Sequence, residues 1–170
     1  MDSYPLFQKN KKRIYVSYDQ HRDAAAYDGF VRLFASLCEI IRDNSLDREL
    51  DTSDAEGHIR NLSEEVLRET ICTVVLCGAH THEDKFVDWE VKASLDLGLG
   101  VLGVILPDNP EDGAGQPTLP PRLQKNFDGG FAVICRWQEL AQSKVDLTQM
   151  IVFAADRPRS LMDNSLPLVR

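Results

Sequence analysis

Glu90 is the residue best placed to carry out chemistry in this sequence. It lies in the stretch 85–98, KFVDWEVKASLDLG, which predicts a helix that begins near Asp84, directly after an apolar strand. The helical period places four residues on one face: Val87, Glu90, Val91 and Ser94. A carboxylate among core residues, beside Trp89 and near a helix N-terminus, suits a cleft better than bulk solvent. The alternative is that Glu90 is only a charge that complements the helix dipole.

A single carboxylate in a cleft can catalyse the cleavage of an N-glycosidic bond to nicotinamide. The reaction passes through an oxocarbenium-like state and releases a neutral heterocycle, so the leaving group needs no general acid. Hydrolysis of O-glycosides differs, because it usually needs two carboxylates. One acid that contacts ribose hydroxyls and stabilises developing positive charge could therefore suffice.

Several other kinds of site are excluded by the sequence. It contains neither G-x-G-x-x-G after the first strand nor G-x-x-x-x-G-K-[ST], so it lacks a dinucleotide fingerprint and a P-loop. A phospho-receiver would carry acids where this chain has Ser17, Tyr18 and Gly78. His80 and His82 have a metal-like spacing but no third ligand nearby, so we expect two loop histidines and no metal.

The composition is that of one soluble globular domain. The chain has 170 residues, of which 43% are hydrophobic and 27% charged, and this length buries roughly 70% of the unfolded surface. A formal charge of -8 argues against a nucleic-acid or anionic-membrane surface, since such binding needs Lys and Arg.

The cysteines and the N-terminus indicate a cytoplasmic protein. The four cysteines form no C-x-x-C pair and read as reduced core residues: Cys38, Cys72, Cys77 and Cys135. The sequence has no apolar run of about 18 residues. The N-terminus also lacks the order of a secretion signal.

Apolar strands alternate with helices along the chain, which predicts an α/β fold with a three-layer, mostly parallel sheet. The predicted strands are 13–18, 38–42, 71–78, 101–106 and 131–135. We expect 13–18 and 71–78 to be central, whereas 38–42 could also be the tail of the preceding helix. The predicted helices are 24 to about 37, a helix with Ser53 as its N-cap, the Glu90 helix, and 137 to about 156. Residues 107–121 are rich in proline and predict a surface excursion.

Three polar segments follow predicted strands: 17–19, 43–45 and 78–90. Ligands of open parallel sheets bind beyond the carboxyl ends of the strands. These segments are therefore expected to meet at one edge.

The ordered motifs of the chain resemble those of the TIR-like domains, specifically the TIR-like sensor proteins of the Thoeris anti-phage system. The motifs are R-I-Y-V-S-Y (13–18), D-N-S (43–45), S-D (53–54), T-V-V-L-C-G (73–78), V-D-W-E (87–90) and D-N-S-L-P-L (163–168). The resemblance implies a flavodoxin-like TIR domain over residues 13–156, with a lead-in at 1–12 and a tail at 157–170.

The resemblance also implies an activity. TIR-like enzymes of this kind use NAD, as a substrate and not as a cofactor, to make a cyclic ADP-ribose-type signal for a separate effector. Glu90 matches their catalytic carboxylate, and the implied substrate-binding residues are Ser17, Tyr18, Asp43, Asn44, Ser45 and Trp89. Trp89 could instead be a core anchor, and residues 43–45 a solvated turn. Such enzymes commonly complete their site by self-association, so we expect the monomer to turn over NAD slowly or not at all. The alternative is a non-catalytic TIR-type interaction module.

Overall fold

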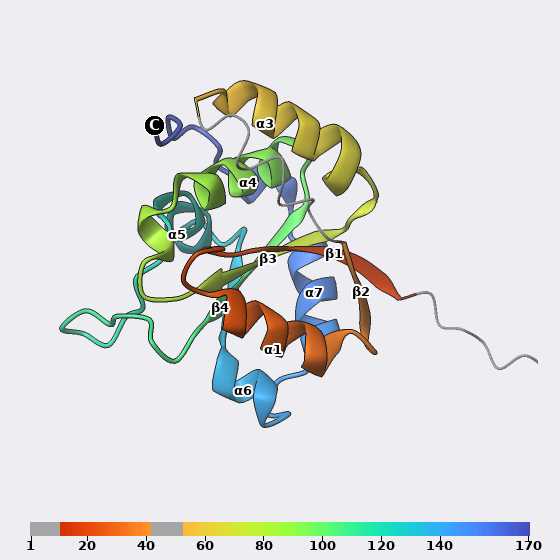
Figure 1. The fold of residues 1–170 in the computed structure, drawn as a ribbon, viewed down its shortest axis with the longest axis vertical. Helices are drawn as coiled ribbons and strands as arrows, with labels where there is room; N and C mark the ends of the chain where they lie inside the picture. The colour runs from red at the N-terminus through yellow and green to blue at the C-terminus, as the bar shows by residue number, and fades with distance from the viewer. Residues whose placement is uncertain (1–10, 42–52) are drawn as a thin grey trace, which may run out of the picture.

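The sheet has five parallel strands in the order β2-β1-β3-β4-β5 (Figure 1). The computed structural model describes residues 11–41 and 53–170. The strands are β1 Lys12–Ser17, β2 Cys38–Ile41, β3 Cys72–Cys77, β4 Gly100–Ile105 and β5 Val133–Arg136. The predicted α/β class is confirmed, and the order is that of flavodoxin-like folds. Both strands expected at the centre, β1 and β3, are interior, and residues 38–41 form a strand and not a helix tail.

The buried positions explain why these segments form the sheet. All residues of β3 and β4 are buried, as expected where helices cover both faces. In β1 the side chains alternate: Ile14 and Val16 belong to one core cluster, whereas Tyr15 packs in a different one. The sheet thus separates two apolar layers.

Helices cover both faces of the sheet. The core cluster on one face takes side chains from α1 Ala24–Phe34, α6 Trp137–Ala141 and α7 Leu147–Ala155. The clusters on the other face take theirs from α3 Ala55–Asn61, α4 Lys85–Asp96 and α5 Pro121–Asp128. A π-helical turn Leu62–Val66 and a 3-10 turn Leu67–Glu69 continue α3, and further 3-10 turns lie at Thr81–Glu83 and Arg159–Leu161. Figure 1 shows the two helical layers on opposite sides of the strands.

The structure corrects several predicted element details. The last long helix is two helices, α6 and α7, because the chain turns at Ser143, whose φ is 54°. The N-cap of α3 is Asp54 and not Ser53, since the Asp54 carboxylate accepts from the Gly57 N–H. Phe30 and Phe34 of α1 are buried and Tyr27 packs against the same core cluster, whereas Leu33 (47%) is exposed. Leu37 (49%), which the predicted helix included, lies beyond α1 and is also exposed. The sequence reading also missed α5.

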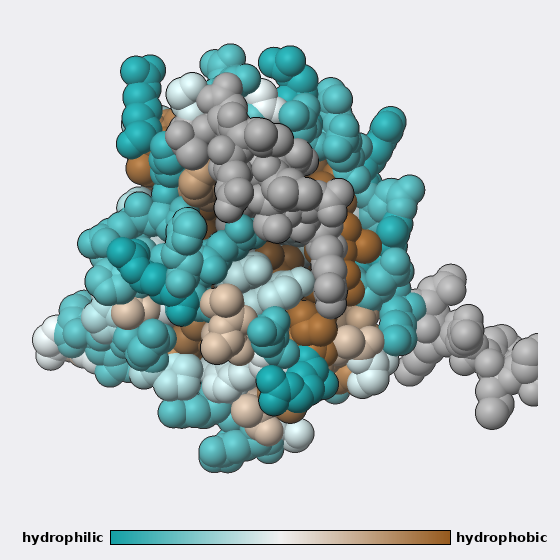
Figure 2. Space-filling view, viewed as in Figure 1, coloured by the Kyte–Doolittle hydropathy of each residue, from teal (hydrophilic) through white to brown (hydrophobic). Residues whose placement is uncertain are grey.

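The surface is mostly hydrophilic on the side seen in Figure 2. Within residues 11–41 and 53–170, no helix has the length and apolar character needed to cross a bilayer.

Candidate functional site

Helix α4 presents the candidate acid and begins at a well-formed cap. The Asp84 carboxylate accepts from the N–H groups of Phe86 at 2.8 Å and Val87 at 3.4 Å, which satisfies donors that have no partner inside the helix. At the other end, Gly98 has a φ of +68°, the left-handed conformation that commonly stops a helix. The cap and the stop fix which residues of α4 face the sheet.

Glu90 is fully buried and points toward β1. The Tyr15 hydroxyl donates to Glu90 Oε1 at 3.0 Å, and the Ser17 hydroxyl donates to Glu90 Oε2. Tyr15 and Ser17 lie two residues apart in β1, so both side chains face the layer that contains α4. Each carboxylate oxygen therefore has a hydroxyl donor, which is the partnering that a buried acid requires.

A second polar connection fixes the backbone at Glu90. Ser94 Oγ donates to the Glu90 carbonyl at 2.8 Å and lies 2.6 Å from the Thr73 hydroxyl of β3. Thr73 and Ser94 are both fully buried. The chain Thr73–Ser94–Glu90 ties α4 to β3, while the Glu90 side chain ties it to β1. Glu90 is held at the switch point of the sheet, where β1 and β3 lie side by side.

Trp89, the residue before Glu90, lines a cleft. Its indole is 1% exposed, and its Nε1 donates to the Val169 carbonyl at 2.8 Å. The Phe86 ring meets it edge-on, with centroids 5.2 Å apart, and Lys85 Nζ lies 5.4 Å from the indole centroid. Trp89 is therefore both a core anchor and a wall residue.

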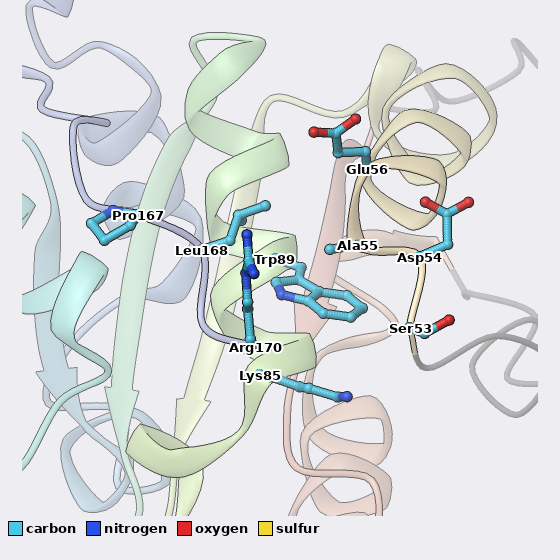
Figure 3. A pocket seen from close by; sticks show the side chains of 9 residues that line it. All are labelled: Ser53, Asp54, Ala55, Glu56, Lys85, Trp89, Pro167, Leu168 and Arg170. Carbon is cyan, nitrogen blue, oxygen red and sulfur yellow. The ribbon is translucent and has the colours of Figure 1, made fainter.

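The cleft has a volume of about 730 Å³ and three sources of side chains (Figure 3). The start of α3 contributes residues 53–56, α4 contributes Lys85 and Trp89, and the C-terminal segment contributes Pro167, Leu168 and Arg170. Clefts of roughly 300–1,000 Å³ are the usual size for small-molecule sites.

Tyr18, a further predicted substrate residue, lies away from Glu90. Tyr18 stacks on Tyr27 of α1, with ring centroids 4.4 Å apart, and packs against the core cluster of the opposite face. The Tyr18 side chain thus lies away from Glu90, whereas the side chain of its neighbour Ser17 contacts Glu90 directly. Asp43, Asn44 and Ser45 lie outside the described residues.

Two further acids lie at the carboxyl end of β1. Asp19 and Asp23 are buried, and the Thr81 hydroxyl donates to Asp23 Oδ2 at 3.2 Å. Burial raises the pKa of Asp23 above its ordinary value, and the carboxylates of Asp108 and Asp19 raise it further. Within residues 11–41 and 53–170, no three His, Cys, Asp or Glu side chains are grouped to hold a metal ion.

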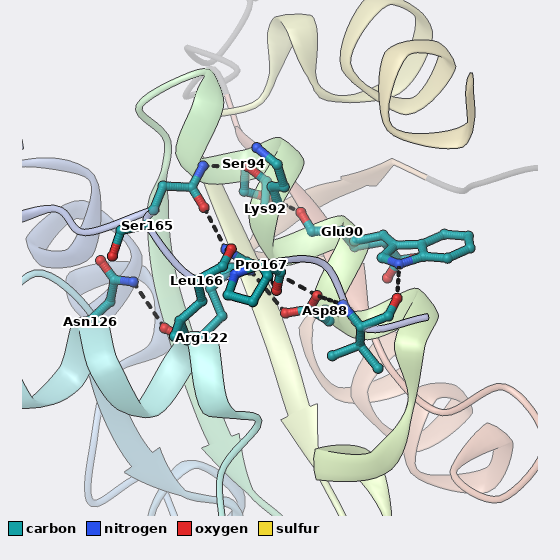
Figure 4. Close-up of polar contacts among 12 residues, drawn as sticks. Asp88, Glu90, Lys92, Ser94, Arg122, Asn126, Ser165, Leu166 and Pro167 are labelled. Carbon is teal, nitrogen blue, oxygen red and sulfur yellow. Dashed lines mark hydrogen bonds and ion pairs between the residues drawn. The ribbon is translucent and has the colours of Figure 1, made fainter. Parts of the chain in front are cut away.

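Sequence reasoning missed Tyr15 and Arg122. Arg122 of α5 is fully buried and makes an ion pair with Asp88, two residues before Glu90 (Figure 4). The signal for Tyr15 was available, because strand alternation puts it on the face of Ser17. No local pattern could have found Arg122, whose partner lies 34 residues away.

One comparison with known proteins gives a match. The family model described as "Thoeris protein ThsB, TIR-like domain" matches residues 15–111, which is more than half of the chain. The matched segment runs from β1 past β4 and contains Tyr15, Ser17 and Glu90. No curated protein matches the chain.

Proposed function

This chain belongs to the TIR-like domain family of the Thoeris protein ThsB, and from this membership we propose that it is a defence enzyme that cleaves NAD and makes a cyclic ADP-ribose-type signal. The signal would activate a separate effector. The observation that carries the proposal is Glu90, a buried carboxylate held by the hydroxyls of Tyr15 and Ser17 at the switch point of the sheet.

The proposed reaction needs one acid. The bond between C1′ of the ribose and the nicotinamide nitrogen breaks, and its electron pair leaves with neutral nicotinamide. Positive charge then develops on the ribosyl group, where a fixed carboxylate stabilises it. A nucleophilic atom of the same ADP-ribosyl unit attacks C1′ and loses any attached proton to solvent, which closes the ring. Water attacking instead gives ADP-ribose.

The burial of Glu90 has a consequence for activity. The side chain has no exposed surface in this chain, so contact with ribose requires the surroundings of the acid to rearrange. Self-association is the proposed trigger, as the family resemblance implies. We therefore expect NAD turnover per chain to rise with protein concentration.

The test measures nicotinamide release and cyclic product by chromatography over a range of protein concentrations. Glu90→Gln should lower the rate roughly 10²-fold or more, which is the scale of losing one preorganised electrostatic partner. The affinity for the nucleotide should be kept. The matched control is Glu64→Gln, an exposed acid beyond α3, which should leave the rate unchanged. Unchanged release in Glu90→Gln, with only a lower melting temperature, would contradict the catalytic assignment. A wild-type chain that assembles but releases no nicotinamide would favour an interaction module.

A further inference from the structure

The C-terminal strap, defined as residues 163–170, is fastened to α5 by two buried side chains, Asn126, which bonds to the backbone of Asp163, and Arg122. Arg122 Nη1 donates to Asn164 Oδ1 at 2.9 Å and to the Leu166 carbonyl at 3.0 Å, and Nη2 donates to the Pro167 carbonyl at 3.1 Å. The bonded residues lie 42 to 45 positions apart in the sequence. Arg122 is 0% exposed and donates three hydrogen bonds to the strap, so its guanidinium fixes the path of that segment.

Helix α4 holds the same strap from the other side. Asp88 pairs with Arg122 through both oxygens, at 2.9 and 3.2 Å, and its Oδ2 also accepts from the Val169 N–H at 3.1 Å. Trp89 Nε1 donates to the carbonyl of the same Val169. The two residues that precede Glu90, Asp88 and Trp89, thus both bind the strap. Figure 4 shows Asp88 between Arg122 and the strap.

The strap is also a wall of the cleft. Pro167, Leu168 and Arg170 line it, and Leu168 packs against the core cluster that contains Trp89. In Figure 3 the side chains of Arg170 and Lys85 flank the indole, while Asp54 and Glu56 project from the start of α3. The cleft therefore combines two cations and apolar surface with carboxylates on its far side.

We propose that this cleft binds the adenosine diphosphate part of the dinucleotide, with Lys85 and Arg170 contacting the phosphates, and that Arg122 is the positioning residue that holds the wall in place. This inference rests on the proposed function. If the ribose to be cleaved lies at Glu90, the remainder of the dinucleotide must extend away from it, and the cleft is lined by the residue next to Glu90 in the sequence, Trp89.

The chemistry of the cleft fits this ligand part. Two phosphates carry negative charge, and in a chain of net charge -8 a cleft lined by two cations attracts them. Leu168 and Pro167 offer apolar contact to an adenine ring, and the carboxylate of Glu56 is an acceptor for ribose hydroxyls or an exocyclic amine. Arg122 and the strap lie outside the matched residues 15–111.

The test uses ADP-ribose as the probe, since it carries the adenosine diphosphate part but no nicotinamide bond to cleave. Calorimetric titration of the whole chain should show binding that Lys85→Ala and Arg170→Ala each weaken roughly tenfold or more, the scale of one charge-assisted hydrogen bond. Lys144→Ala, an exposed cation between α6 and α7, is the matched control and should leave the affinity unchanged.

Arg122→Lys separates positioning from general stability. It keeps the charge but loses the planar fork, so it should weaken ADP-ribose binding about as much as Arg170→Ala and raise the KM for NAD with kcat nearly unchanged. Leu140→Ala, in the core of the opposite face, lowers the melting temperature without touching the strap and should bind ADP-ribose like the wild type. Equal weakening in Leu140→Ala would overturn the positioning role.

The inference and the proposed function fail in different ways. No ADP-ribose binding at millimolar concentration, or equal binding by the wild type, Arg170→Ala and Arg122→Lys, overturns the inference. Nicotinamide release whose KM is the same in the strap variants also overturns it and leaves the function standing. Strap-dependent ADP-ribose binding without nicotinamide release supports the inference and overturns the function.

Discussion

Replacing Tyr15 with phenylalanine removes a single hydroxyl from beside Glu90 and leaves the ring in the core. The Tyr15 oxygen lies 3.0 Å from Glu90 Oε1, and the two residues are 1% and 0% exposed. A hydrogen bond to a charged group contributes about 1.5–3 kcal/mol, and losing the donor leaves a buried carboxylate oxygen without that partner. Tyr15→Phe should therefore cost about 1.5–3 kcal/mol of the roughly 5–15 kcal/mol that stabilise a domain.

A double-mutant cycle identifies the partner. In the Glu90→Gln background the phenol faces a neutral amide, so its removal should cost only about 0.5–1.5 kcal/mol. The resulting coupling energy is about 1 kcal/mol. Urea unfolding at pH 7, followed by circular dichroism with the m-value checked for constancy, measures all four proteins. An equal loss in both backgrounds would refute the argument, because the cost of Tyr15→Phe would then be independent of the charge on residue 90.

Three further perturbations test other parts of the fold. Burial is the chief reason that the pKa of Asp23 is raised above 3.8 in the folded protein. Ionised Asp23 therefore destabilises the fold, and this destabilisation sets in as pH rises from 3.8 through the folded pKa. Asp23→Asn should raise the melting temperature at pH 7, and this gain should vanish well below pH 3.8. Burial also raises the thiol pKa values, to about 11 for Cys38 and about 12 for Cys72 and Cys135. A thiol reagent at pH 8 should therefore label these cysteines only after denaturation, and rapid labelling of the native protein would contradict their burial. A Cβ at Gly100 would lie 2.6 Å from the backbone of Ala154 in α7, so Gly100→Ala should cost about 1–3 kcal/mol in chemical denaturation, whereas Gly113→Ala, with open space around it, should cost far less.

The parts of the fold that the sequence predicted are those set by local periodicity. The face of α4 that carries Val87, Glu90, Val91 and Ser94 is buried as expected, because four side chains at helical spacing can meet only one surface. The apolar run of β3 likewise required cover on both faces. The break between α6 and α7 was missed, because no Gly or Pro marks the turn at Ser143, whose φ is positive.

The placement of Tyr18 away from Glu90 follows from the geometry of a strand. Ser17 and Tyr18 were assigned together to the substrate site, yet consecutive strand residues point to opposite faces. With Ser17 on Glu90, Tyr18 has to face the other layer, where it stacks on Tyr27. The same rule assigns Tyr15 to the acid, as the structure shows. Motif adjacency is thus a poor guide to a site when the motif lies on a strand.

Three consecutive residues of α4 link the strap to the acid, because Asp88 and Trp89 both bind Val169 of the strap while Glu90 binds β1. Successive helical residues are about 100° apart, so Asp88 reaches Arg122, Trp89 reaches Val169, and Glu90 reaches β1. A shift of the strap therefore pulls on the helix turn that carries Glu90. Ser94 and Thr73 oppose that pull from β3. Loosening the strap should consequently weaken ligand binding before it disturbs the acid, which is why Arg122→Lys is expected to raise KM with kcat nearly unchanged, whereas a change at Glu90 itself should lower kcat and leave nucleotide affinity intact.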